Sequence, residues 1–270
     1  TRDRRQRQMC IRDSINTLDL EKNLVIPQVY KKLFSKMASF TISNSDILRA
    51  VSSSTEEQAL SFDPSKKVVR FPAWVDFEIF SNVKPLRNNE KNFKILFIGS
   101  VTDRKKPHLI VEAMNNFNSK DIKLYIVGPT PNENYLSQLK KLVQEYDLVD
   151  QVSFTGSIDR KSVMDHYADT NLMILPSVSE GLARVIFESQ VTACPVLVTD
   201  APGMGDIVID GQTGYIFESD NLESLTSKIQ EIKNNYQDAI HVGNNAKNFI
   251  LSNYSADNFK FSFKKLFDAV

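Results

Sequence analysis

Cysteine and histidine are scarce in this chain of 270 residues. It has two cysteines, Cys10 and Cys194, and neither belongs to a metal-ligand spacing. One isolated pair of cysteines is no disulfide framework, and it favours a reducing compartment. The three histidines, His108, His166 and His241, are scattered, so we expect them to be structural or surface residues.

A net charge and long apolar runs are also missing. The 33 Lys and Arg residues balance 33 Asp and Glu residues, so no overall field favours nucleic acid. No apolar run approaches the ~20 residues of a membrane-spanning helix, and we find no signal peptide. An apolar content of 41% is enough for a sizeable core. We expect a cytoplasmic protein, with peripheral contact to the inner face of the plasma membrane as an open alternative.

The first residues are basic and have almost no apolar positions. Residues 1–14 can be interpreted as a nucleic-acid-binding arm or as a disordered tail. A third interpretation is favoured, because the run resembles translated sequencing-adaptor sequence. We therefore treat residues 1–14 as a non-native tail, exclude them from fold reasoning, and expect the natural protein to extend further upstream.

From Phe93 onward, short apolar runs alternate with helical patterns. This alternation predicts an α/β fold with a doubly wound parallel sheet and right-handed crossovers. In such sheets ligands bind beyond the carboxyl ends of the strands. Strands are expected at 94–98, 123–127, 152–154, 171–175 and 195–199, and helices at about 108–117, 135–146 and 161–168.

Fewer helices and strands are expected before Phe93. Strands are expected at 47–51 and 68–71, with a capped helix start at Ser52 between them. Residues 27–40 have apolar residues at helical spacing with Lys on the other face. Such a helix can lie on a membrane, but packing on a domain is the favoured interpretation. Residues 83–92 are charged and polar with one Pro, so we expect an interdomain linker.

The stretch from Pro176 to Glu188 has the pattern of a loop and a helix start after a buried strand. A helix is expected from about Leu182, and a helix N-terminus binds phosphate well. Glu180 precedes this helix and Glu188 lies on about its second turn, where each carboxylate can accept hydrogen bonds from hydroxyls. The layout fits a nucleotide-sugar. The plain alternative is an amphipathic helix with two solvated glutamates.

These two glutamates, with seven residues between them and Pro195-Val196 after them, resemble the retaining GT-B glycosyltransferases of family 4. The family pattern is close to E-G-F-x-x-V-x-x-E-A-M-A-x-G-x-P-V. The chain departs from it at Ser189, Gln190, Val191 and Ala193. Further stretches resemble sequence motifs of the same family, and they occur in the family's order: 46–54, 71–80, 127–131, 154–158, 199–208 and 210–215.

The loop from Gly99 to Pro107 resembles the family's G-R-L-x-x-x-K-G, whose Arg and Lys hold the diphosphate. Lys105 falls on the Lys, but Ser100 falls on the Arg. Arg104 and Arg184 are the candidates for supplying the missing charge. Taken alone, the loop would by default be interpreted as a solvated basic turn.

The resemblance implies roles for particular residues. Glu180, Lys105 and Arg104 are the expected catalytic residues, with Glu180 orienting the sugar hydroxyls and Glu188 holding the ribose. No D-x-D triplet occurs, so no metal ion is expected, and no cofactor, since the nucleotide-sugar is a substrate. The expected donor-binding residues are Gly99, Ser100, Gly128, Gly156, Ser157, Ile158, Gly181, Leu182, Ala183, Arg184, Val185 and Glu188.

The resemblance also implies a domain organisation and a reaction. Residues 15–82 would end an N-terminal, acceptor-side domain, 93–254 would bind the nucleotide-sugar, and 255–270 would pack back toward the first domain. The expected enzyme transfers a hexose from a UDP- or GDP-sugar to a glycan or lipid-linked acceptor in polysaccharide biosynthesis, with retention and without a metal. As a fragment lacking most of its first domain, the chain is expected to bind donor weakly or to be inactive.

Two alternatives stay open. One is a GT-B sugar-nucleotide epimerase, and the other is a non-catalytic nucleotide-binding module. A Rossmann dehydrogenase is disfavoured because no G-x-G-x-x-G follows a predicted strand.

Overall fold

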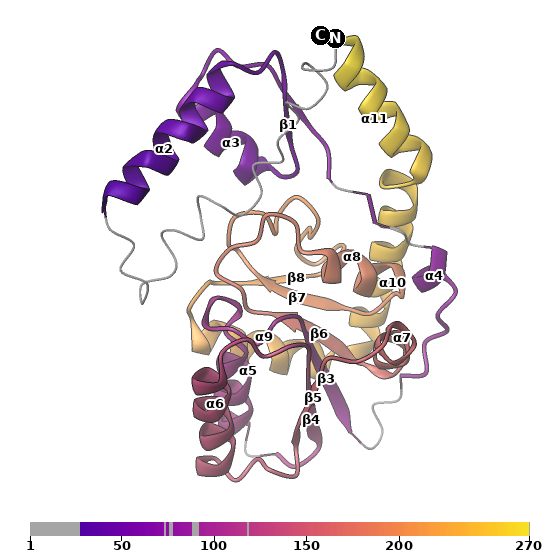
Figure 1. Ribbon diagram of the computed structural model, residues 1–270. Helices are drawn as coiled ribbons and strands as arrows, with labels where there is room; N and C mark the ends of the chain where they lie inside the picture. Colours follow the sequence, from indigo (N-terminus) through magenta and orange to yellow (C-terminus); the bar gives the residue numbers. More distant parts are fainter. Residues whose placement is uncertain (1–27, 73, 76–77, 88–91, 118, 270) are drawn as a thin grey trace. The chain divides into compact units, whose positions relative to one another are not determined.

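The computed structural model describes residues 28–72, 74–75, 78–87, 92–117 and 119–269 (Figure 1). The tail predicted at residues 1–14 lies outside this range. The chain divides into two compact units. The first contains the described residues up to Trp74 together with the segment that begins at Tyr254, and the second is Val75–Asn253.

In the first unit a small parallel sheet pairs β1 (Leu48–Ala50) with β2 (Val68–Arg70). Two helices accompany it, α2 (Gln28–Ser43) and α3 (Ser53–Phe62). The expected cap of α3 is present, because Ser52 Oγ accepts from Thr55 N and Thr55 Oγ1 accepts from Ser52 N. The run of hydroxyl residues therefore starts a helix, as predicted.

Helix α11 (Ala256–Asp268) belongs to the first unit although it ends the chain. Phe259 and Phe263 pack edge-on against Phe71, with ring centroids 5.8 and 5.1 Å away. The Arg49 guanidinium lies 4.3 Å from the centre of the Phe71 ring, a cation–π contact. An aromatic and cationic cluster thus joins α11 to β1 and the end of β2.

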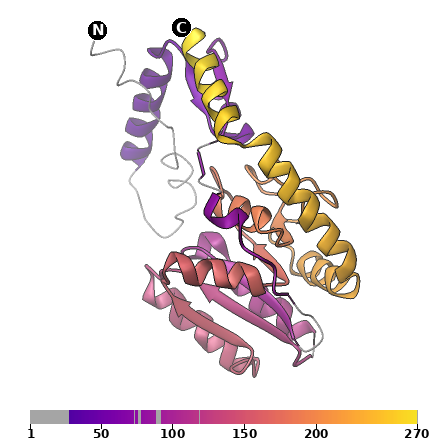
Figure 2. The ribbon, with the colours of Figure 1, turned by 90° about the vertical axis from the view of Figure 1, so that its right-hand side faces the viewer.

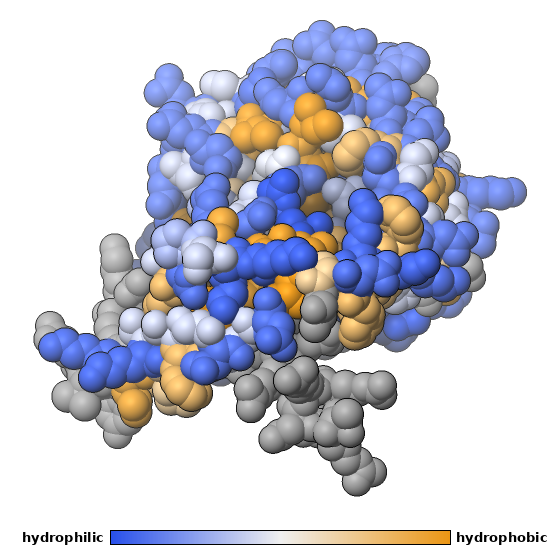
Figure 3. Space-filling model, turned by 90° about the horizontal axis from the view of Figure 1, so that it is seen from above, coloured by the Kyte–Doolittle hydropathy of each residue, from blue (hydrophilic) through white to orange (hydrophobic). Residues whose placement is uncertain are grey.

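Helix α2 does not bury its apolar stripe within the described residues. Leu33, Phe34, Met37 and Phe40 are all exposed, Phe40 to 70%, while Ile42 is fully buried. In the view from above, the coloured residues are mainly hydrophilic, with apolar residues exposed among them (Figure 3). The packing expected for this stripe is therefore not seen, apart from the last turn of the helix.

The second unit contains a six-stranded, fully parallel sheet in the order β5-β4-β3-β6-β7-β8. This arrangement confirms the predicted α/β fold, and the strand ends differ from the expected ones by at most two residues. Strands β6 and β7 are buried along their whole length, as parallel strands covered on both faces are. The strands are β3 (Phe93–Ile98), β4 (Ile122–Val127), β5 (Val152–Gly156), β6 (Leu172–Leu175), β7 (Val196–Thr199) and β8 (Tyr215–Phe217).

Helices cover both faces of this sheet (Figures 1 and 2). On one face lie α5 (Pro107–Asn116), α6 (Glu133–Glu145) and α9 (Leu222–Asn234). On the other lie α7 (Arg160–Asp169) and α8 (Arg184–Val191), with α10 (Tyr236–Asn253) packed on α8. Two short helices were not predicted, α4 (Glu78–Ser81) and the 3₁₀ turn η1 (Asp103–Lys105).

The segment predicted as a linker is tied to the second unit. Leu86 N donates to Ala168 O at 2.8 Å, and Arg87 donates to the carbonyls of Thr170 and Thr192 at 2.7 and 2.8 Å. Polar composition suggested a solvated connection, but these groups instead satisfy the ends of α7 and α8. The division between the units follows Trp74, whereas the predicted linker is residues 83–92.

The strand order creates one switch point. From β3 the chain builds outward through β4 to β5, then returns to β6 on the other side of β3 and continues to β8. The loops that leave β3 and β6 therefore diverge to opposite faces of the sheet, and in doubly wound sheets ligands bind at such a point. This point places the loop after Gly99 beside the loop after Pro176.

Candidate active site

The loops after β3 and β6 meet around one carboxylate. Lys105 Nζ lies 3.1 Å and Arg104 Nη1 lies 3.3 Å from Glu180 Oε1. The Ser177 hydroxyl donates to the same oxygen at 2.8 Å. The Glu180 side chain is only 9% exposed. The three residues predicted to be catalytic, far apart in the sequence, are thus brought together.

Backbone hydrogen bonds hold this loop pair in place. Arg104 Nη1 donates to Ser179 O at 2.6 Å, and Val178 N donates to Arg104 O at 3.2 Å. Glu180 N reaches Pro202 O at 3.4 Å in the loop after β7. The carboxylate is therefore positioned by three strand ends rather than by its own side-chain preference.

Glycines allow the strand ends to approach closely. A Cβ at Gly128 would lie 2.1 Å from Gly99 O, and Gly128 has φ 137°. Lys105 Nζ would lie 3.1 Å from a Cβ at Gly99, so the lysine side chain runs across that glycine. Gly128 N also donates to Gly156 O at 2.8 Å. The predicted glycines thus form a row along the ends of β3, β4 and β5.

One of the three loop cations turns away from the cluster. Lys106 has a left-handed backbone, φ 47°, and its ammonium pairs with Asp220 before α9. Of the three loop cations, Lys105 and Arg104 are therefore the two that lie beside Glu180.

Helix α8 begins later than predicted, at Arg184 instead of about Leu182. Ala183 is the residue before the helix, with ψ 86°, outside the helical region, and it offers no side-chain cap. Gly181, Leu182 and Ala183 therefore belong to the loop. Arg184 N donates to Leu182 O at 3.1 Å, so this tight turn precedes the first helical residues.

Glu188 faces a tyrosine that sequence reasoning missed. The Tyr167 hydroxyl donates to Glu188 Oε2 at 3.2 Å. Burial raises the pKa of Glu188, while the Tyr167 hydrogen bond and the charges of Arg184 and Arg160 act in the opposite direction. Arg184 thus stabilises the ionised form of Glu188. Of the two candidates for the charge that is missing at Ser100, Arg104 is the one that lies beside Glu180. Nothing in the pattern of α7 singles out Tyr167.

The expected donor-binding residues Gly156, Ser157 and Ile158 lie further along the same edge of the sheet. Gly156 is left-handed, φ 66°, and Gly156 and Ser157 are exposed, with Ile158 partly buried. Gly156 ends β5 and the other two residues follow it, two strands from β3, which corresponds to about 10 Å across the sheet. They are therefore outside the Glu180 cluster, but one elongated ligand can reach both.

No three His, Cys, Asp or Glu side chains gather as metal ligands in the described part of the chain. His108 Nδ1 and the Tyr135 hydroxyl share a hydrogen bond of 2.7 Å, a structural role. Within the same range, no helix is both long and apolar enough to cross a bilayer.

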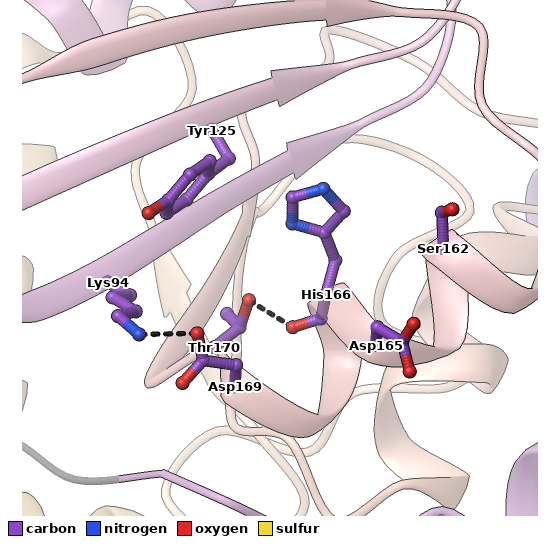
Figure 4. A pocket seen from close by; sticks show the side chains of 7 residues that line it. All are labelled: Lys94, Tyr125, Ser162, Asp165, His166, Asp169 and Thr170. Carbon is purple, nitrogen blue, oxygen red and sulfur yellow. Dashed lines mark hydrogen bonds and ion pairs between the residues drawn. The ribbon is translucent and has the colours of Figure 1, made fainter.

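A separate pocket of about 300 Å³ lies between α7 and the strands β3 and β4 (Figure 4). An ion pair between Lys94 and Asp169 closes one side, and the His166 ring lies 5.3 Å from the Tyr125 ring. The pocket contains none of the predicted site residues. Its lining is Lys94, Tyr125, Ser162, Asp165, His166, Asp169 and Thr170.

Comparison with known proteins gives a family match. Residues 78–249 match the family model described as "Glycosyl transferases group 1". The chain is 25% identical over 175 residues to the capsular polysaccharide biosynthesis glycosyltransferase CapM of Staphylococcus aureus, covering 61% of this chain and 43% of CapM. It is 22% identical over 228 residues to a GDP-mannose-dependent alpha-(1-6)-phosphatidylinositol monomannoside mannosyltransferase of Mycolicibacterium smegmatis, covering 78% and 59%. The chain thus spans about half the length of these relatives.

A solved structure shares the fold. Anabaena Alr3699/HepE, in complex with UDP and glucose, superimposes with a TM-score of 0.78 at 15% identity, over 90% of this chain and 69% of that one. At this identity the likeness shows the fold alone.

Proposed function

Because this chain belongs to the group 1 glycosyl transferases, we propose that it forms the donor-binding part of an enzyme that transfers a sugar from a nucleotide-sugar to an acceptor hydroxyl. The observation that carries the proposal is the meeting of Lys105, Arg104 and Glu180 at the switch point between β3 and β6. Two cations and a carboxylate there suit an anion joined to a hydroxyl-rich ring.

The diphosphate is assigned to the two cations. In the structure both pair with Glu180, so a bound diphosphate takes over part of their charge and the carboxylate turns to hydroxyls. Hydrogen bonds between charged partners are about twice as strong as neutral ones, which favours this exchange. Glu180 then orients the sugar, and Glu188, on α8, accepts a hydrogen bond from the ribose.

The difficult step is cleavage of the bond between the sugar and the diphosphate, with charge growing on the leaving phosphate. Lys105 and Arg104 are the groups that stabilise this charge, together with the N-terminus of α8. Preorganised donors of this kind typically contribute about 3 kcal/mol each. Retention of configuration and independence of a metal ion are proposed from the family 4 resemblance.

The donor and acceptor classes are proposed from the relatives. A GDP-mannose-dependent relative and a fold neighbour with UDP support a UDP- or GDP-hexose donor. The name of CapM supports a glycan acceptor in polysaccharide biosynthesis. A lipid-linked acceptor, and a cytoplasmic site of action at the membrane, belong to the same proposal.

Calorimetry with UDP, GDP and NAD tests the binding half of this proposal. We expect one of the two nucleoside diphosphates to bind and NAD not to bind. Replacing Lys105 by Met should weaken that binding about tenfold or more, because a charge-assisted contact to phosphate is lost. The matched control is Lys120→Met, since the Lys120 side chain is 79% exposed and pairs with Asp147 on the surface.

Binding of NAD alone, or equal nucleotide affinity in Lys105→Met, would contradict the proposal. Transfer is tested with radiolabelled UDP- and GDP-hexoses on a protein as long as these relatives, because this chain spans about half of their length. Labelled glycan supports a transferase, whereas release of an epimerised sugar without glycan labelling would point to an isomerase.

A further inference from the structure

We propose that Tyr167 is a positioning residue that holds one carboxylate oxygen of Glu188, so that the other oxygen faces the ribose of the donor. The inference rests on the proposed function, and it assigns to α7 a role that the sequence pattern does not suggest. Tyr167, Val185 and Glu188 all lie in the second unit.

The Tyr167 hydroxyl has little choice of partner. The residue is fully buried, and its ring packs edge-on against Phe80 at 6.0 Å. The hydroxyl oxygen has two acceptors within hydrogen-bond distance, Glu188 Oε2 at 3.2 Å and Val185 O at 3.3 Å, and a single proton to donate. A buried hydroxyl without a partner is costly, and a carboxylate is a stronger acceptor than a carbonyl. The hydrogen bond to Glu188 is therefore the more favourable of the two.

This contact orients the carboxylate. Glu188 is partly buried on α8, and its Oε2 is occupied by Tyr167. No described residue donates a hydrogen bond to its Oε1. A glutamate loses considerable side-chain freedom when it binds a ligand. Tyr167 removes that freedom beforehand, which is how preorganisation improves affinity.

The charges around Glu188 are few. Arg184 on α8 and Arg160 at the start of α7 favour its ionised form, Tyr167 donates to that form, and burial opposes it. Loss of the Tyr167 hydroxyl therefore leaves the carboxylate easier to protonate. If Tyr167 contributed only the packing of its ring, this titration would stay unchanged.

The first test is binding to the 270-residue chain. Tyr167→Phe keeps the ring and removes the hydroxyl, and we expect UDP, or GDP if that is the nucleotide bound, to bind about tenfold more weakly. Pyrophosphate, which lacks ribose, should bind as it does to the wild type. In a Glu188→Ala background the same substitution should have no further effect. Tyr135→Phe is the matched control, because its buried hydroxyl bonds to His108.

The second test needs no ligand. The Glu188 carboxyl is titrated by carbon NMR in labelled protein, and its pKa should rise in Tyr167→Phe but not in Tyr135→Phe. An unchanged Glu188 pKa, or equal nucleotide affinity in Tyr167→Phe and wild type, overturns the inference while leaving the proposed function intact. If the wild type binds neither UDP nor GDP, the proposed function fails, and the titration still decides whether Tyr167 holds Glu188.

Discussion

At the scale of single residues, the charge balance of the site depends on Glu180. One nearly buried carboxylate compensates two cations, Lys105 with 12% and Arg104 with 37% of the side chain exposed. Removing one member of such a group leaves the others uncompensated in a partly desolvated place. We therefore expect Glu180 to stabilise the fold and also to compete with a bound phosphate for these two cations.

Neutralising Glu180 should separate these effects. In Glu180→Gln we expect pyrophosphate and UDP to bind about three- to tenfold tighter by calorimetry, because Lys105 and Arg104 no longer share their charge with a carboxylate. Sugar transfer should fall, and the free energy of unfolding should drop by about 1–3 kcal/mol. The control Glu188→Gln, whose carboxylate lies near neither loop cation, should weaken UDP binding. Weaker pyrophosphate binding in Glu180→Gln would rule out the competition.

The pH dependence of stability should carry a contribution from His108. Burial lowers its pKa below the ordinary 6.5, with Glu112 and Asp103 opposing in part. Below pH 6.5 His108 becomes protonated in the unfolded chain, whereas in the folded chain it stays neutral down to a lower pH. Acidification therefore destabilises the fold. This contribution is fully present above pH 6.5 and is lost as the pH falls through the lower, folded-state value.

Urea unfolding at pH 7.5 and pH 5.5 checks this expectation. His108→Gln retains a hydrogen-bonding group for Tyr135 but cannot titrate, so it should lose less stability on acidification than the wild type. Some decline should remain, because burial also lowers the pKa of His166. Identical losses in the two proteins would mean that His108 does not titrate differently on folding.

At the scale of elements, the site requires β3 and β4 to end in contact. Gly128→Ala places a methyl group on Gly99 O and imposes a strained φ, so we expect a loss of about 3 kcal/mol or more in the free energy of unfolding. Gly205→Ala is the control, since no heavy atom lies within 4 Å of the added carbon. It should change stability by less than about 0.5 kcal/mol. Equal stability of the two variants in urea would show that the loops relax freely.

The end of α6 offers a stabilising substitution. Leu148 N donates to Val143 O at 2.9 Å and Asp147 N to Gln144 O at 3.2 Å, a Schellman ending with Asp147 at φ 54°. Asp147→Gly should raise the free energy of unfolding by about 0.5–1 kcal/mol, because glycine adopts this conformation without strain. The pair with Lys120 is 79% and 93% exposed and contributes little.

Asp147→Val tests the reason for this gain. A β-branched residue is strongly disfavoured at positive φ, so this variant should be less stable than the wild type in urea. A gain in both variants would mean that loss of the carboxylate, rather than backbone strain, is responsible.

At the scale of the whole molecule, the second unit contains its own sheet, its covering helices and the entire Glu180 cluster. We therefore expect residues 75–253, expressed alone, to fold cooperatively and to bind UDP or GDP within about threefold of the affinity of the 270-residue chain. Circular dichroism and calorimetry check this. An unfolded fragment, or one that has lost nucleotide binding, would show that the first unit is needed for the site.

The sequence by itself determined the elements, because these follow from local patterns. Buried strands such as β6 appear as short apolar runs, and the Ser52 cap of α3 depends on hydroxyls three residues apart. The doubly wound fold could likewise be predicted from the alternation of strands and helices. Glu180, Glu188 and Lys105 were singled out as candidates through their spacing and the family resemblance, and their roles stay predictions.

Only the tertiary structure decided which of these residues meet. Strand order sets which loops share the switch point, and no local pattern encodes that order, so the contact of Lys105 with Glu180 could not be derived. The left-handed turn at Lys106 and the hydroxyl of Tyr167 at Glu188 likewise depend on packing between distant segments. The chemistry of a side chain follows from its residue type and can be inferred from the sequence. Which side chains lie close together is a property of the whole chain, because it arises from burying many surfaces at once.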